Sequence, residues 1–265
     1  MRRWSALVGT AAAILAGCGG GDASNEHGSN VVEIQGDEYA FVMPSTLDGG
    51  WTTLRLENTG EDPHEFALAK LDGDRTRADV LEVLSDPATQ EQGPPEWVAI
   101  RAGIPTLQAG ETASLTQQLE PGRYALICFL DGPSGKPHFL DGMLSVVDVG
   151  DDAGAEAPEA DATVKLGKSL QAPELEPGER TLELSNDAGE PSAVFLVSYK
   201  PGKTDEDLVA WEEGGMKGPA PGSFHGGAID VPPHSSVYYT YTFETGVDYA
   251  LVDDVNEIER RFRVG

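Results

Sequence analysis

The sequence predicts an all-β protein made of two β-sandwich domains in series. Its 265 residues include 32 glycines and 18 prolines, which divide the chain into short segments rich in valine, threonine and tyrosine that favour strands. A second observation is an internal repeat, because 175–213 runs parallel to 47–85, with Asn186 matching Asn58. This length allows two cores, and the repeat indicates duplication. An acidic, alanine-rich stretch without a large apolar residue, 150–160, is the expected linker between the domains.

The N-terminus has the features of a targeting segment. Arg2 and Arg3 precede an apolar stretch that ends in Leu15-Ala16-Gly17-Cys18, and this tetrapeptide resembles a bacterial lipobox. We therefore expect 1–18 to be a lipoprotein signal peptide whose Cys18 is lipidated, and 19–30 to be a flexible tether. The protein would then be held by its lipid on the extracytoplasmic side of a membrane, in the periplasm or at the outer cell surface.

The first domain is expected to contain about eight strands and one inserted helix. The segment 72–86 is predicted to be helical, because Val80, Leu81 and Leu84 share one helical face and Pro87 ends the pattern. Alternating apolar residues between glycine and proline turns predict the strands. These are 31–35, 39–43, 51–58, a strand beginning at 64, 97–101, 112–119, 124–129 and 143–149.

The second domain repeats this order, including a short helix. In that helix Thr204 and Asp207 resemble a capping box ahead of Leu208. His225 and His234 are expected to lie in glycine- and proline-rich turns, so we interpret both as ordinary surface residues.

The repeat fails at the residues that could bind a metal. Asp253 stands where the first domain has Cys128, and the equivalent of His64 falls near Ser192 and Ala193. The second domain, 161–265, is therefore expected to lack soft metal ligands.

In the first domain Cys128, His138 and Met143 follow one another across a single loop, and His64 begins an earlier strand. Two imidazoles, a thiolate and a weak axial thioether form a ligand set that copper takes in electron-transfer sites. If Cys18 is lipidated, Cys128 is the remaining thiol of an exported protein, where free thiols tend to oxidise. The alternative is that Cys128 is a packed core thiol and that the other three residues are incidental.

The first domain resembles the cupredoxins, the blue copper family. The likeness rests on Asn58-Thr59-Gly60-Glu61-Asp62-Pro63-His64, on Pro121-Gly122-Arg123-Tyr124 leading to Cys128, and on Pro137-His138 to Gly142-Met143. It implies two Greek-key β-sandwich (cupredoxin-like) domains, of which 31–149 binds one mononuclear type 1 copper. By the same resemblance His64, Cys128 and His138 would be equatorial ligands and Met143 the axial ligand, with extracytoplasmic electron transfer as the function.

Some residues depart from the family pattern. Nine residues separate Cys128 from His138, and Glu65 follows the first histidine where many members carry asparagine or serine. Ile127 and Phe129 flank the cysteine, whereas multicopper oxidases and copper nitrite reductases place at least one histidine there. Together with the absence of hydrolase motifs, this predicts a protein that is not an enzyme.

The net charge of −27 bears on the choice of partner. An acidic surface repels phosphate backbones, which argues against nucleic acid, and it can attract a basic protein or a cation. A generally solvated surface is the simpler explanation of the charge. We expect a redox or copper-delivery protein as partner, with two alternatives to electron transfer: copper capture or delivery, and a structural or docking module that binds no metal.

Overall fold

The computed structural model describes residues 30–86, 89, 93–214, 218–253, 256 and 258–265. The expected signal peptide, its Cys18 and all but the last residue of the tether lie outside these ranges. Among the described residues, no helix has both the length and the apolar character that crossing a membrane requires.

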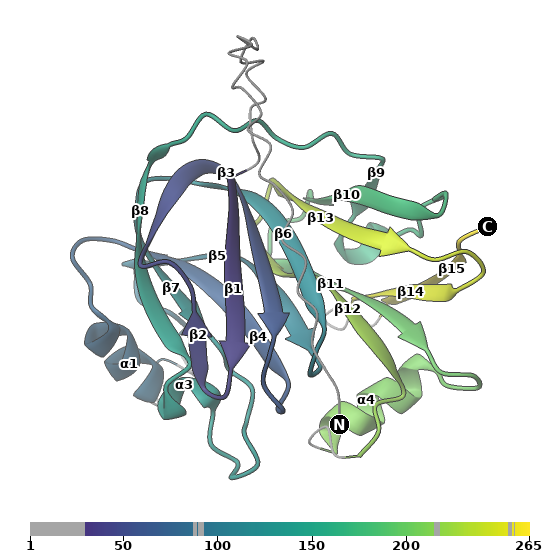
Figure 1. Cartoon of the computed structure of the whole chain (residues 1–265), viewed down its shortest axis with the longest axis horizontal. Coiled ribbons are helices and arrows are strands. Elements are labelled where there is room, and N and C mark those ends of the chain that lie inside the picture. Colours follow the sequence, from purple (N-terminus) through teal and green to yellow (C-terminus); the bar gives the residue numbers. More distant parts are fainter. Residues whose placement is uncertain (1–29, 87–88, 90–92, 215–217, 254–255, 257) are drawn as a thin grey trace, which may run out of the picture.

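The first half contains eight strands and two short helices within the described residues. The strands are β1 (Asn30–Asp37), β2 (Ala40–Val42), β3 (Thr46–Asn58), β4 (His64–Leu71), β5 (Val98–Leu107), β6 (Thr112–Leu119), β7 (Gly122–Ile127) and β8 (Leu144–Asp152). The helices are α1 (Arg77–Ser85) and α3 (His138–Asp141). One layer has the order β2-β1-β3-β6 and the other β5-β4-β7-β8, and the start of β3 also pairs with β8 (Figure 1).

The second half repeats this arrangement. Its elements are β9 (Ala162–Lys165), a 3-10 turn (Gly167–Ser169), β10 (Gly178–Asn186), β11 (Ser192–Tyr199), α4 (Asp205–Glu213), β12 (Gly222–Val231), β13 (Ser235–Phe243), β14 (Asp248–Asp253) and β15 (Ile258–Arg263). The layers β9-β10-β13 and β12-β11-β14-β15 have the order of β1-β3-β6 and β5-β4-β7-β8. The predicted all-β architecture is confirmed, with a short helix inserted at the same place in each half.

Two buried asparagines show how closely the halves correspond. The side-chain amide of Asn58 donates to the carbonyl oxygens of Asp62 and Leu107, at 2.9 Å each. The amide of Asn186 donates to the carbonyls of Glu190 and Val231, at 2.9 and 2.8 Å. Each asparagine therefore ties the loop that follows its own strand to the opposite layer, because a buried amide needs hydrogen-bond partners.

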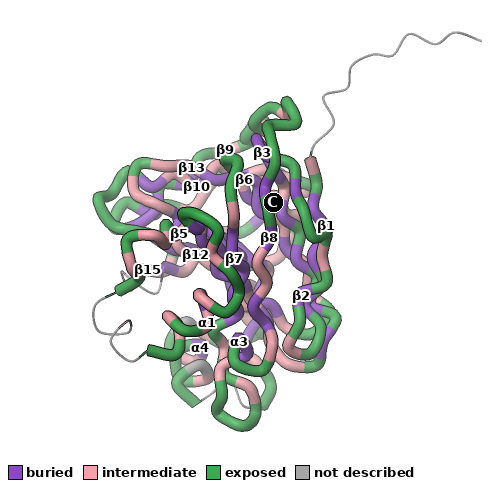
Figure 2. The backbone as a smooth tube through the Cα atoms, turned by 90° about the vertical axis from the view of Figure 1, so that its left-hand side faces the viewer, coloured by how far each residue is buried: buried purple, intermediate pink, exposed green. Residues whose placement is uncertain are grey.

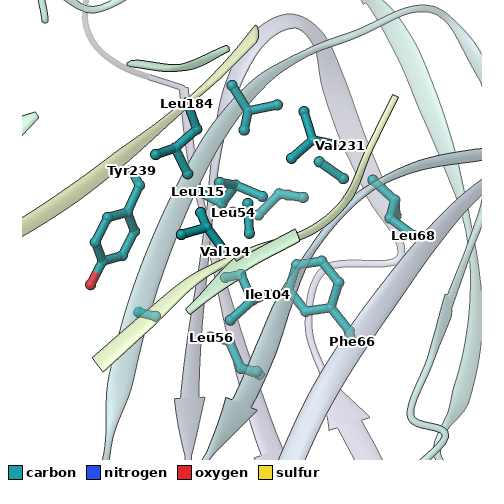
Figure 3. Close-up of a cluster of buried hydrophobic side chains, with 14 of the residues drawn as sticks. Leu54, Leu56, Phe66, Leu68, Ile104, Leu115, Leu184, Val194, Val231 and Tyr239 are labelled. Carbon is teal, nitrogen blue, oxygen red and sulfur yellow. The ribbon is translucent and has the colours of Figure 1, made fainter. Parts of the chain in front are cut away.

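The two halves share one hydrophobic core. Strands β6 and β13 pair antiparallel, with Leu115 opposite Tyr239. These two residues are equivalent in the repeat. Leu115 also pairs with Leu54, four residues before Asn58, and Tyr239 also pairs with Leu182, four residues before Asn186. Figure 3 shows side chains from both halves meeting in this cluster, and Figure 2 shows buried residues running through the interior of both halves. Such a continuous apolar core stabilises the halves against each other.

The boundaries of several predicted elements are shifted. The predicted strand 51–58 begins earlier, at Thr46, and the strand expected to end at 149 continues to Asp152, which lies in the expected linker. The first helix is shorter than predicted, because Thr76 caps it and forms a capping box with Asp79. A further short helix, α3, lies inside the ligand loop, where none was predicted.

Candidate metal centre

The structure brings together three of the four predicted ligands as a compact cluster. The ligand atoms of His64, Cys128 and His138 all lie within 4.8 Å of one another. The sulfur of Cys128 is 3.5 Å from Nδ1 of His138, and the two imidazole centroids are 5.1 Å apart. All three side chains are fully buried.

The backbone explains this convergence. His64 is the first residue of β4, which runs antiparallel to β7, so it lies near the end of β7, where Cys128 follows. The amide of Cys128 donates to the carbonyl of Met143, and the amide of Phe139 donates to the carbonyl of Cys128. These two hydrogen bonds hold both ends of the ligand loop against each other.

Met143 lies at the same pole of the first half and is fully buried. A Cβ atom placed on Gly36 would be 3.3 Å from Cε of Met143 and 3.4 Å from Cβ of His64. The end of the Met143 side chain and the first histidine therefore both lie beside Gly36.

Two imidazoles and a thiol form a donor set that suits a soft or borderline metal ion such as copper. Both ring nitrogens of His64 and Nε2 of His138 are buried without a hydrogen-bond partner among the described residues. Burying such atoms unpaired costs free energy, and a metal ion bound to one ring nitrogen of His64 would offset part of that cost. The Cys128–His138 distance is that of a hydrogen bond between a thiol and an imidazole, and zinc bonds of about 2.3 Å to sulfur and 2.0 Å to nitrogen at a tetrahedral angle would also place two such atoms about 3.5 Å apart.

Electrostatics favours neutral imidazoles at this site. Burial, with a smaller contribution from His138, lowers the pKa of His64 to about 4. Burial also lowers the pKa of His138. Both rings keep a lone pair at neutral pH, as metal ligands must.

The thiol of Cys128 depends on a cation to ionise. Burial raises its pKa to about 12, although the backbone amides of Glu65 and Leu130 hydrogen-bond the sulfur and oppose that shift. A metal held here would bind the deprotonated thiolate, which the backbone amides of Glu65 and Leu130 would stabilise through their hydrogen bonds to the sulfur.

Glu65 braces the ligand loop in the place where asparagine or serine was expected. Its carboxylate accepts hydrogen bonds from the backbone amide of Phe129 and, at 3.4 Å, from the hydroxyl of Thr106. Burial raises the pKa of this carboxyl to about 7. Glu65 thereby connects the first histidine to the residue that follows Cys128.

Sequence reasoning missed Tyr39 as part of the site. Its ring contacts His138 edge to face, with centroids 4.8 Å apart, and its hydroxyl donates to Asp62 at 2.9 Å. Asp62 belongs to the segment that carried the family resemblance, but no sequence signal connects it with Tyr39, which lies 23 residues earlier.

At the corresponding place in the second half the residues serve other contacts. Ser192 and Asp253 are buried where the first half has His64 and Cys128. The carboxylate of Asp253 accepts hydrogen bonds from the backbone and side-chain amides of Asn256, each at 2.9 Å.

The interpretation of His225 as a surface residue is wrong, whereas His234 is exposed as expected. His225 lies in β12, partly buried, with Nε2 2.7 Å from the hydroxyl of Ser198 and Nδ1 3.1 Å from that of Tyr241. The strand continues through the glycines around His225, which the sequence reading took as a turn.

No family model matches the chain, and no curated protein matches it. Among solved structures, the chain is similar to an auracyanin from Roseiflexus castenholzii, with 25% identity over 46% of this chain and 98% of that chain and a TM-score of 0.33. Auracyanin A from Chloroflexus aurantiacus, described as a "blue" copper protein, has 24% identity over 46% of this chain and 100% of that chain, with a TM-score of 0.33. A multicopper oxidase has 13% identity over 89% of this chain and 88% of that chain, with a TM-score of 0.25.

Proposed function

We propose that this protein is a cupredoxin that binds one type 1 copper ion through His64, Cys128, His138 and Met143 and transfers electrons. One observation carries the proposal: two imidazoles and a thiol converge within 4.8 Å in a fully buried space and leave ring nitrogens without partners. Copper supplies one-electron chemistry to such a soft, mixed ligand set.

The protein would contribute rigidity and exclusion of water. The ligand loop is held by backbone hydrogen bonds between Cys128, Phe139 and Met143, and all four predicted ligands are fully buried. A preorganised, dry site needs little rearrangement when the charge of the ion changes, which favours fast electron exchange.

The buried ligands favour electron transfer over copper delivery. Handing a copper ion to another protein requires ligands that a partner's ligands can reach, whereas these side chains have no exposed surface. Ile127 and Phe129 on either side of Cys128 provide no histidine toward a second copper, which supports a carrier over an oxidase or reductase.

The proposal also includes where the protein is located and which kind of partner it meets. The N-terminal lipobox-like sequence with Cys18 supports a lipid anchor and a place in the cell envelope. The net charge of −27 supports a redox protein with a basic surface as partner and argues against nucleic acid. The second half would serve as a scaffold or docking domain that shares the core of the first.

Loading the purified protein with Cu(II) tests the proposal. We expect one copper per chain, an intense visible charge-transfer band from the Cys128 thiolate, and a reversible one-electron wave. Lack of that band while Cys128 is reduced would rule out the type 1 site. Stoichiometric binding of Cu(I) alone, without a reversible wave, would favour copper capture instead.

A further inference from the structure

We infer that Tyr39, held in place by Asp62, is a cap that closes the His138 side of the metal site against solvent and small anions. This inference rests on the proposed copper site, although part of its test does not need copper. The ring of Tyr39 lies against the imidazole of His138, with centroids 4.8 Å apart and planes at 66°. Its hydroxyl is fixed by a 2.9 Å hydrogen bond to the carboxylate of Asp62.

The backbone of Tyr39 adopts a conformation that few residues other than glycine take. Its φ is 59°, and among the described non-glycine residues only Asp230 and His234 are also in this region. A bulky residue in the left-handed region costs about 1–2 kcal/mol. Surrounding contacts must maintain that conformation, which points to a role for the position of this ring.

A glycine in the ligand loop makes room for the backbone of Tyr39. A Cβ atom on Gly142 would lie 2.7 Å from the carbonyl oxygen of Tyr39, closer than van der Waals contact permits. Gly142 directly precedes Met143, so the turn that carries Tyr39 packs against the end of the ligand loop.

A second glycine makes room for the ring. A Cβ atom on Gly132 would lie 3.4 Å from the hydroxyl of Tyr39 and 3.4 Å from both Cδ2 and Nε2 of His138. The hydroxyl of Tyr39 and the imidazole of His138 therefore both border Gly132, where a larger residue would meet both of them.

The cap contributes to the burial of His138 in a loop that lies partly at the surface. In this loop Phe129 and Leu140 are 45% and 39% exposed, whereas His138 has no exposed surface and the adjacent Phe139 is also buried. Tyr39 is itself partly exposed, so its ring stands between the imidazole and solvent. Without the ring, the edge of His138 that carries Nε2 would be open to water and anions.

Three variants distinguish the contribution of the Tyr39 ring from that of its hydrogen bond to Asp62. Tyr39→Phe removes only the hydroxyl, and Asp62→Asn replaces its charged acceptor with a neutral one. Tyr39→Asn removes the ring but keeps a residue type that tolerates positive φ. Thermal unfolding of the full chain shows whether each variant is folded.

The first measurement uses the metal-free protein. Acylation of histidines by diethylpyrocarbonate, followed peptide by peptide by mass spectrometry, reports the exposure of His138, and exposed His234 serves as the internal reference. We expect Tyr39→Asn to raise the rate at His138 about tenfold or more relative to His234, since a protected group reacts only through opening. The Phe and Asp62→Asn variants should lie between it and wild type.

The second measurement uses the Cu(II) protein titrated with azide. We expect wild type to keep its visible spectrum and Tyr39→Asn to form an azide complex. A folded Tyr39→Asn protein whose His138 reacts as slowly as in wild type would overturn the cap. Failure of wild type to take up copper would overturn the proposed function. The rate of acylation of His138 relative to His234 would still show whether Tyr39 shields His138.

Discussion

The sulfur of Cys128 and Nδ1 of His138 lie 3.5 Å apart, both in side chains without exposed surface. The two residues are ten positions apart in the chain and are positioned by the closed ends of one loop. This is a hydrogen-bonding distance for a thiol and an imidazole, and it also suits two donor atoms that bind one ion. The four predictions that follow test this site and the scaffold that holds it.

Replacing Cys128 with serine should abolish the blue colour and weaken copper binding by more than about 100-fold, since losses of 10–100-fold follow even from changes to groups that only support metal ligands. A hydroxyl does not ionise as a thiol does and gives no sulfur-to-copper charge transfer. Visible absorption and copper stoichiometry measure both effects. As a matched control, Asp253→Ser at the equivalent position of the second half should keep the colour.

Changing Met143 should shift the reduction potential while the copper stays bound. Met143→Gln offers a harder oxygen donor that favours Cu(II), so its potential should fall, whereas Met143→Leu removes the weak axial donor, so its potential should rise. In protein-film voltammetry the reduction potential should increase in the order Met143→Gln, wild type, Met143→Leu. Identical potentials for all three proteins would show that Met143 is not a ligand.

Variants of Asn58 and Asn186 distinguish an effect on the stability of the fold from an effect on the metal site. Asn58→Ala and Asn186→Ala should each lower the free energy of unfolding by about 2–4 kcal/mol, because each leaves one buried and one partly buried carbonyl group without its donor. Urea denaturation of the metal-free protein measures this loss. Only Asn58→Ala should also alter the copper spectrum, because its loop leads into His64. An unchanged copper spectrum in Asn58→Ala would show that this loop does not support the metal site.

His225 should make the protein less stable in acid. Burial lowers its pKa to about 4, so between that value and the ordinary pKa near 6.5 the unfolded chain binds a proton that the folded chain excludes. Its contribution to stability is present above about pH 6.5 and is lost as the pH falls.

A His225→Gln variant isolates this effect, since all other titrating groups are retained. From pH 7 to pH 5, wild type should lose about 1–2 kcal/mol more of its free energy of unfolding than the variant. Equal losses in the two proteins would contradict the assignment of a buried, neutral histidine.

The sequence predicts the strands well, for physical reasons, and three of the four expected ligands lie together in the structure. Alternating apolar residues determine which face of a strand is buried, and the match between Asn58 and Asn186 reflects equivalent hydrogen bonds. The strand ends were less predictable, because β3 is extended to Thr46 by pairing with β8, a contact distant in the chain. Local composition carries no information about that pairing.

The parts of the site that sequence reasoning missed depend on contacts between segments. Tyr39 touches His138 only because three turns converge at one pole, and no spacing pattern marks that meeting. His225 was misplaced because its glycine neighbours usually indicate a turn, whereas here tyrosine side chains from β13 enclose it. Tertiary packing overrode the local signal in both cases.

The pairing of β6 with β13 joins the two halves of this chain in the way that two subunits join in a symmetric dimer. Equivalent strands meet at Leu115 and Tyr239, as the two copies of a protein do across a twofold axis. Each half thus covers an edge strand that would otherwise invite pairing with other molecules. Only one half then needs to keep the proposed metal ligands, which leaves the other half free to diverge as long as it continues to shield that edge.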